Sequence, residues 1–107
     1  MFSILALRSV AHMLKSESKI QKEIIAYLKA RGCHVIRNAG SFRNGEADLI
    51  ACVSGTFVAI EVKKEGEKPN DLQLAKQKSV QASGGISIIA YSVDDVKNVL
   101  PYLAMRE

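Results

Sequence analysis

One stretch of the chain, residues 45–64, constrains the possible folds more than any other. It contains two apolar runs, Ala47–Val53 and Thr56–Val62, joined by Ser54-Gly55. Aliphatic and β-branched runs that are separated by a two-residue turn containing glycine predict a β-hairpin. A turn confined to these two residues pairs the residues that flank it, and this fixes the register of the whole ladder.

The predicted register brings two carboxylates together at the open end of the hairpin. Counting back from the turn places Leu49 opposite Ile60 and Asp48 opposite Glu61. Like charges on directly opposed residues repel, because their Cβ atoms lie only ~5 Å apart. A divalent cation between them removes the repulsion, and Mg²⁺ prefers carboxylate oxygens. Lys63 projects from the same face of the strand as Glu61, because it follows two residues later.

This set of side chains suits metal-dependent hydrolysis. Asp48 and Glu61 offer two ligands, and the carbonyl of Val62 is close enough to add a third oxygen. A bound metal lowers the pKa of a coordinated water and neutralises developing charge. Lys63 orients the water or offsets that charge. The alternative interpretation is a surface cluster in which Lys63 bridges two carboxylates.

The rest of the chain alternates between helical and strand patterns. Spacing, caps and turn residues predict helices over 3–15, 18–31, 70–82 and 92–103 and strands over 33–37 and 86–91. The second helix is expected to begin at Ser18 in a capping box with Gln21, the third at Asn70 or Asp71, and Pro101 to end or kink the last one. A helix between the last two strands implies a crossover, so the fold class is α/β with helices on both faces of a mixed sheet.

A chain of 107 residues fits a single domain, 1–107, with residues 1–16 as an N-terminal helical extension. The apolar stripe of that extension either packs on its own domain or contacts a second subunit. No run approaches the ~20 apolar residues of a membrane span. Cys33 and Cys52 form no C-x-x-C pattern, and we interpret them as reduced core thiols of a cytosolic protein.

The net charge of +4 favours an anionic partner, most commonly nucleic acid. The positive excess is concentrated between residues 8 and 43. Lys22, Arg37 and Arg43 are the expected phosphate contacts, with Lys64 as either a phosphate contact or a solvated side chain. The loop over 38–45 either binds phosphates through its backbone N–H groups or forms a plain turn.

A D…E-x-K pattern on adjacent strands after a first helix resembles the PD-(D/E)XK nuclease superfamily, whose common core has the order αβββαβ. More closely, the chain looks like the small stand-alone VRR-NUC nucleases of phages and bacteria, over roughly residues 18–95. The motifs that match are R-N at 37–38, G-E-A-D at 45–48, E-V-K at 61–63, P-N-D-L-Q at 69–73 and A-S-G-G at 82–85. Glu46 and Ala47 depart from the family, which often has a proline before the aspartate.

The resemblance implies a restriction-endonuclease-like fold and metal-dependent hydrolysis of phosphodiester bonds in DNA. It implies that Asp48, Glu61 and the Val62 carbonyl bind the metal and that Lys63 is the catalytic lysine. It also points to Gln73 as a catalytic residue beside the site. Glu23, from its position alone a solvated glutamate, becomes the first-helix metal ligand.

The expected cofactor is Mg²⁺, with Mn²⁺ as a substitute. The resemblance further implies a homodimer that acts on branched DNA such as Holliday junctions, in the cytoplasm of a bacterial or phage-infected cell. Two alternatives remain open: a catalytically inactive DNA-binding module of the same fold, or a nuclease on flapped or linear DNA.

Overall fold

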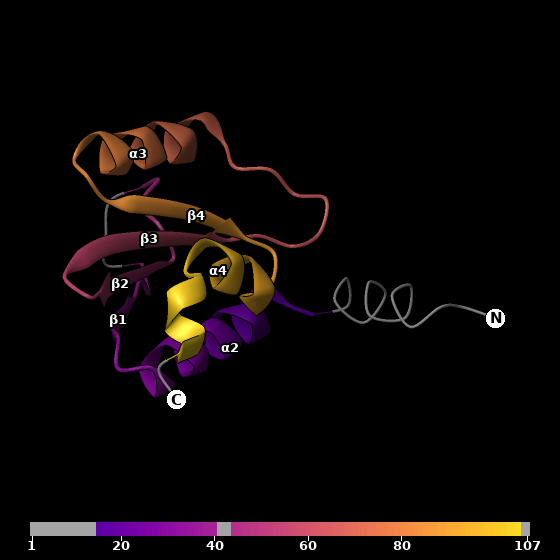
Figure 1. Cartoon of the computed structure of the whole chain (residues 1–107). Coiled ribbons are helices and arrows are strands. Elements are labelled where there is room, and N and C mark those ends of the chain that lie inside the picture. Colours follow the sequence, from indigo (N-terminus) through magenta and orange to yellow (C-terminus); the bar gives the residue numbers. More distant parts are fainter. Residues whose placement is uncertain (1–14, 41–43, 106–107) are drawn as a thin grey trace.

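The computed structural model describes residues 15–40 and 44–105 (Figure 1). Its elements are α2 (Glu17–Ala30), β1 (His34–Arg37), β2 (Leu49–Val53), β3 (Thr56–Val62), α3 (Asp71–Ala82), β4 (Ile86–Ala90), α4 (Val93–Val99) and the 3₁₀ helix η1 (Pro101–Met105). Except for Lys15, the predicted N-terminal helix over 3–15 lies outside the described residues, and so does the predicted DNA contact Arg43.

The four strands form one mixed sheet in the order β1-β2-β3-β4. The pairs β1–β2 and β2–β3 are antiparallel, whereas β3 and β4 are parallel. Parallel neighbours need a crossover connection, and α3 provides it. The predicted restriction-endonuclease-like α/β fold with a mixed sheet is confirmed.

The hairpin of β2 and β3 has the predicted register, from Val53 opposite Thr56 to Leu49 opposite Ile60. Both turn residues have positive φ, 52° at Ser54 and 81° at Gly55. Two consecutive positive φ values characterise the type I′ turn, whose twist matches that of the flanking strands. The tight turn therefore sets which residues meet at the far end of the hairpin.

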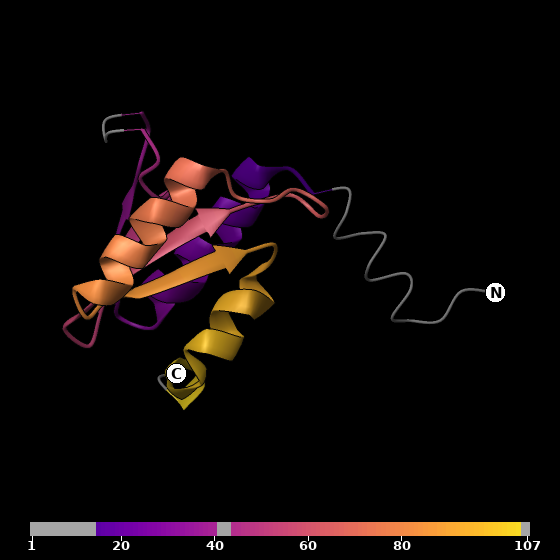
Figure 2. The ribbon, with the colours of Figure 1, turned by 90° about the horizontal axis from the view of Figure 1, so that it is seen from above.

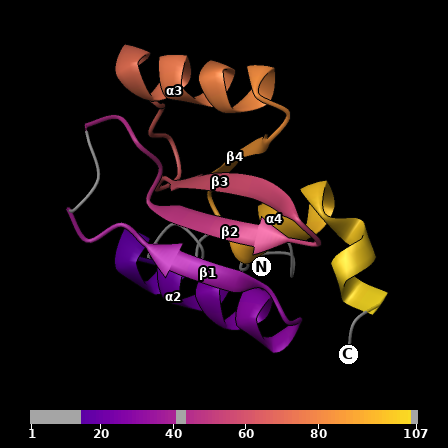
Figure 3. The same ribbon diagram turned by 90° about the vertical axis from the view of Figure 1, so that its left-hand side faces the viewer.

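The hydrophobic core lies on one side of the sheet, where α2 and α4 pack, while α3 lies on the other side (Figure 3). The fully buried large side chains are Ile20, Ile24, Leu28, Leu49, Val53, Val58, Ile60, Val62, Val96, Leu100 and Leu103. None of them comes from α3, which has no buried residue and runs alongside β3 and β4 (Figure 2). The site described below therefore lies on the sheet face that has no large core.

Two local predictions need correction. The helix α2 is capped by Ser16, whose side chain accepts a hydrogen bond from the Lys19 N–H at 3.1 Å, so the predicted start at Ser18 is wrong. Ser18 lies within the first turn, where the side chain of Ser16, two positions earlier, already serves as the cap for the Lys19 N–H. Cys33 is buried as expected, but Cys52 is exposed, because alternate residues of β2 face opposite sides of the sheet.

The C-terminal prediction is largely confirmed. The helix α4 has Ser92 at its N-cap and ends at Val99, and η1 begins at Pro101. Instead of a serine cap bond, the Asp95 carboxylate accepts a hydrogen bond from the Tyr91 N–H at 2.7 Å. Among residues 15–40 and 44–105, no helix has the length and apolarity needed to cross a membrane.

Candidate functional site

Asp48 is held by backbone contacts at the point where the hairpin ladder ends. Its Oδ2 accepts a hydrogen bond from the Val62 N–H at 2.8 Å. Its carbonyl accepts one from the Asn38 N–H, also at 2.8 Å. The Asn38 side chain donates in addition to the carbonyl of Ala47 at 3.3 Å. Asp48 is therefore fixed from two neighbouring strand ends, although it lies just outside β2.

Glu61 lies beside Asp48, as the register predicts, and the two carboxyl groups are hydrogen-bonded. Within the part of the chain that the structure describes, Glu61 is the single buried charged residue, with 5% of its surface exposed. Burial, together with the charge and hydrogen bond of Asp48, raises the pKa of Glu61 to about 8 against the opposing charge of Lys63. Both carboxylates cannot be ionised cheaply without a cation.

Gln73 orients Glu61 from the first turn of α3. Its side-chain Nε2 donates to Glu61 Oε1 at 2.9 Å, while its Oε1 accepts from the Asn70 N–H at 2.9 Å. The Asn70 side chain in turn accepts from the Gln73 N–H at 2.8 Å, which completes a capping box. Because its oxygen is engaged by Asn70, the Gln73 amide presents its NH₂ group to Glu61.

The carboxylate of α2 that interacts electrostatically with Asp48 and Glu61 is Glu17, which was not predicted from the sequence. Burial raises the pKa of Glu17, and so do Glu67, through its charge and a hydrogen bond, and the charge of Asp48; Lys63 opposes them. Glu23, the predicted ligand, instead forms an ion pair with Lys15 at 3.1 Å. The signal that would have pointed to Glu17 is its place directly after the cap residue Ser16.

Lys63 and Val62 lie at the same strand end. Lys63 is half-buried, and its charge acts on both Glu61 and Glu17. The N–H and carbonyl of one residue in an antiparallel strand point toward the same neighbouring strand. Since the Val62 N–H bonds to Asp48, the Val62 carbonyl is directed to the same side.

The predicted phosphate contacts Lys22, Arg37 and Lys64 are exposed. Arg37 Nε donates to the Gln21 side chain at 3.0 Å, which ties the end of β1 to α2 next to Lys22. Lys64 directly follows Lys63 after the end of β3, and its N–H donates to Glu67 at 3.2 Å.

The donors present fit a small, hard divalent cation. Among the described residues, no three His, Cys, Asp or Glu side chains are grouped to enclose a metal ion. The residues that could hold such an ion are Asp48 and Glu61, with a backbone oxygen as a third donor and Glu17 nearby. Mg²⁺ suits this set, because it binds through one or two carboxylates and retains several waters.

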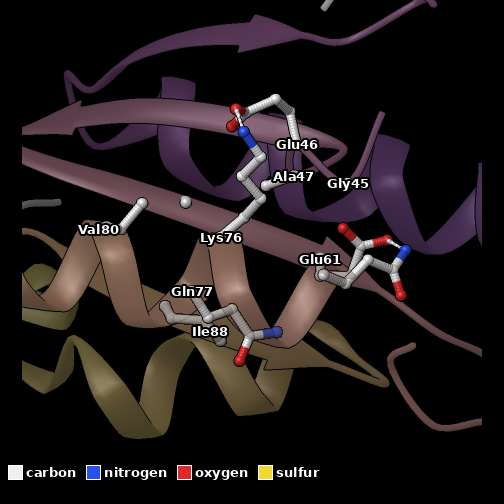
Figure 4. A pocket seen from close by; sticks show the side chains of 10 residues that line it. Gly45, Glu46, Ala47, Glu61, Lys76, Gln77, Val80 and Ile88 are labelled. Carbon is white, nitrogen blue, oxygen red and sulfur yellow. Dashed lines mark hydrogen bonds and ion pairs between the residues drawn. The ribbon is translucent and has the colours of Figure 1, made fainter. Parts of the chain in front are cut away.

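A small cavity lies beside Glu61, between α3, the segment 45–47 and strands β3 and β4 (Figure 4). Its lining includes Gly45, Glu46, Glu61, Lys76 and Gln77. Its volume of about 10 Å³ is room for roughly one water molecule. The cavity is therefore too small to hold a substrate.

Gly45 provides a first testable prediction, because α3 leaves no space for a side chain there. Its φ is +84°, and an added Cβ would overlap Leu72 Cγ. Gly66, with a φ of +86° and nothing within 4 Å, is the matched control. We expect Gly66→Ala to cost ~1 kcal/mol for the left-handed backbone alone. Gly45→Ala should cost roughly 1–2 kcal/mol more, from forced displacement of Leu72.

Chemical unfolding of the two variants measures this difference directly. Leu72→Ala in the Gly45→Ala background is expected to recover most of the additional cost. Equal destabilisation by the two glycine substitutions would show that the contact with Leu72 does not matter.

Comparison with known proteins places this geometry in a family. Residues 12–98 match the family described as archaeal Holliday junction resolvase (Hjc). A solved structure described as a VRR_NUC domain superposes with a TM-score of 0.70 and 26% identity, over 80% of this chain and 95% of that chain. No curated protein gave a match. The family match spans most of the chain, and the superposed fold is that of a PD-(D/E)XK-like nuclease, so the chain belongs to the archaeal Holliday junction resolvase family of nucleases.

Proposed function

We propose that the protein is a metal-dependent DNA endonuclease that cuts branched DNA, with Holliday junctions as the preferred substrate. The observation that carries this proposal is the buried Glu61, hydrogen-bonded to Asp48 and close to Lys63. A protein has little reason to bury a carboxyl against another carboxyl for stability. The family named for Holliday junction resolution supports the choice of substrate.

Each residue has a proposed role in this reaction. Asp48, Glu61 and the Val62 carbonyl hold Mg²⁺ or Mn²⁺, which supplies a water of lowered pKa and charge neutralisation at the phosphate. Lys63 orients the attacking water or offsets negative charge that develops on the phosphate. Gln73 keeps Glu61 in its ligating orientation through the 2.9 Å hydrogen bond.

The DNA-binding surface is proposed to include Lys22, Arg37, Arg43 and Lys64. The first two side chains lie on adjoining elements, linked through Gln21. Each contact with a phosphate releases a counterion, so binding should weaken steeply with salt. We further propose that the protein is a homodimer, because a four-way junction is resolved by two cuts and a monomer has one site. The proposed location is the cytoplasm.

The direct test is a cleavage panel with and without Mg²⁺ or Mn²⁺. Labelled four-way junctions, flaps, and linear duplexes of matched sequence are incubated with the protein, and its mass in solution is measured in parallel. We expect metal-dependent cutting, fastest on the four-way junction, and a dimeric mass. Binding without cutting in either metal would favour the alternative, a DNA-binding module of the same fold. Equal cutting of all substrates would remove the proposed selectivity.

Glu17 and Glu23 can be distinguished by one pair of substitutions. We expect Glu17→Gln to lower the cleavage rate by roughly 10- to 100-fold, as loss of a group close to a metal site often does. Glu23→Gln breaks only the ion pair with Lys15 and should change the rate less than about threefold. Single-turnover rates at saturating DNA measure both. The opposite ranking would restore the predicted metal role of Glu23.

A further inference from the structure

The helix α3 contacts both sides of the candidate metal site, although it contributes nothing to the core. Three side chains on one face of its first two turns make these contacts, and we call Leu72, Gln73 and Lys76 the α3 clamp. Leu72 packs on Gly45, and Gln73 donates to Glu61. Lys76 forms an ion pair with Glu46, with its Nζ 3.1 Å from Oε1.

The Lys76–Glu46 ion pair acts on the strand end that carries Asp48. Figure 4 shows Lys76 extending from α3 to Glu46, with Glu61 beside the same helix. Glu46 lies two residues before Asp48, and Gly45 and Ala47 on either side of it also line the cavity against α3. The segment 45–47 is thus held by α3 on one side and by Asn38, through Ala47, on the other.

We propose that Lys76 and Glu46 are positioning residues that set the distance between Asp48 and Glu61. The proposal rests on the proposed function, since it assumes that these two carboxylates hold the metal. The α3 clamp holds Glu61 directly through Gln73 and Asp48 indirectly through Glu46. One helix therefore holds the two carboxylates at a fixed separation, and neither Lys76 nor Glu46 touches the metal or the DNA in this role.

If Lys76 acted only through its charge, its removal would change the metal affinity in the opposite direction. A cation near the site repels the metal, so removing Lys76 for its charge alone should tighten metal binding. Removing it as a positioning residue should weaken binding, because the carboxylates lose their fixed separation. The direction of the change in metal affinity therefore separates the two explanations.

The experiment is a calorimetric titration of Mn²⁺ into the metal-free protein. It compares the wild type with Lys76→Met, Glu46→Gln and the double variant. We expect each single change to weaken Mn²⁺ binding by about tenfold, within the range seen for residues that orient metal ligands. The double variant should be no worse than either single one, because both remove the same contact. The charge-reversed pair Lys76→Glu with Glu46→Lys should recover most of the affinity.

Lys78→Met is the matched control, because it removes the same charge from an exposed position on another face of α3. It should leave Mn²⁺ affinity unchanged. Tighter binding by Lys76→Met, or unchanged binding in both single variants, overturns the proposal. So does a Lys76→Met variant that loses junction affinity in EDTA while Glu46→Gln keeps it, because Lys76 would then be a phosphate contact.

The outcomes also separate this proposal from the proposed function. If the wild-type protein cuts junctions but both variants bind Mn²⁺ normally, the positioning role is wrong and the nuclease function stands. If the wild-type protein binds Mn²⁺ and cuts no DNA, while both variants bind more weakly, the positioning role stands without the nuclease function.

Discussion

Lys63→Ala is expected to abolish DNA cleavage while leaving the fold and junction binding intact. The Lys63 ammonium is the cation that acts on both Glu61 and Glu17, and alanine leaves no group to orient a water or to offset charge. Loss of one electrostatic group at a reaction centre typically costs ~10²–10³ in rate. Asp48→Ala removes a proposed metal ligand and should have at least as large an effect.

Single-turnover cleavage of a labelled junction measures the rates, and gel shifts in Ca²⁺ or EDTA measure binding. Circular dichroism checks that each variant keeps the fold. Lys64→Ala provides the contrast. It should raise the dissociation constant for the junction and make that constant less dependent on salt. At saturating protein, its cleavage rate should equal that of the wild type. Metal-dependent cleavage that survives both Lys63→Ala and Asp48→Ala would exclude this site as the reaction centre.

Glu61→Gln is expected to eliminate cleavage and to make the metal-free protein more stable. Burial and Asp48 raise the pKa of Glu61 from 4.5 to about 8. At neutral pH the folded protein therefore holds a proton that the unfolded chain releases, and this mismatch lowers the free energy of unfolding. Glutamine is neutral at every pH and retains an oxygen to accept from Gln73. We expect a gain on the order of 2 kcal/mol at pH 7.5, discounted for the partial screening of the pair by Lys63 and water.

The same carboxyl predicts a pH dependence with a defined sign. Between pH 4.5 and about 8 the folded state binds more protons than the unfolded state, so stability falls as pH rises through this window. Urea unfolding in EDTA at several pH values should show the decline in the wild type and a flatter profile in Glu61→Gln. Saturating Mg²⁺ should stabilise the wild type and have little effect on the variant. A variant less stable than the wild type at pH 7.5 would contradict the argument.

The hairpin could be predicted from the sequence because every step of the inference was local. A two-residue turn fixes which residues pair, and the strand period of two then fixes the faces on which they lie. Asp48 and Glu61 meet only 13 residues apart in the chain, so no assumption about the tertiary fold was needed. A cap at Asn70 was one of two candidates predicted for the same reason, whereas its capping box with Gln73 and the bond of Gln73 to Glu61 were not predicted.

The features that the sequence did not predict depend on how elements pack. Glu17 and Glu23 lie six residues apart on α2, which places them on different faces of the helix. Which face meets the hairpin depends on how α2 packs against the sheet, and a wrong start at Ser18 also excluded Glu17 from the helix. The Lys76–Glu46 ion pair joins residues 30 positions apart, between a helix and a loop, and no periodicity predicts such a contact.

The type I′ turn has a consequence for how this family can vary in length. Because the ladder alone aligns Asp48 with Glu61, residues added in the loops before Gly45 or after Lys64 leave the alignment of the two carboxylates unchanged. A single residue inserted between Leu49 and Ile60 would shift the pairing by one and turn either Asp48 or Glu61 toward the core face. Length variation among related chains should therefore be absent from the hairpin and concentrated in those two loops, whatever their sequences.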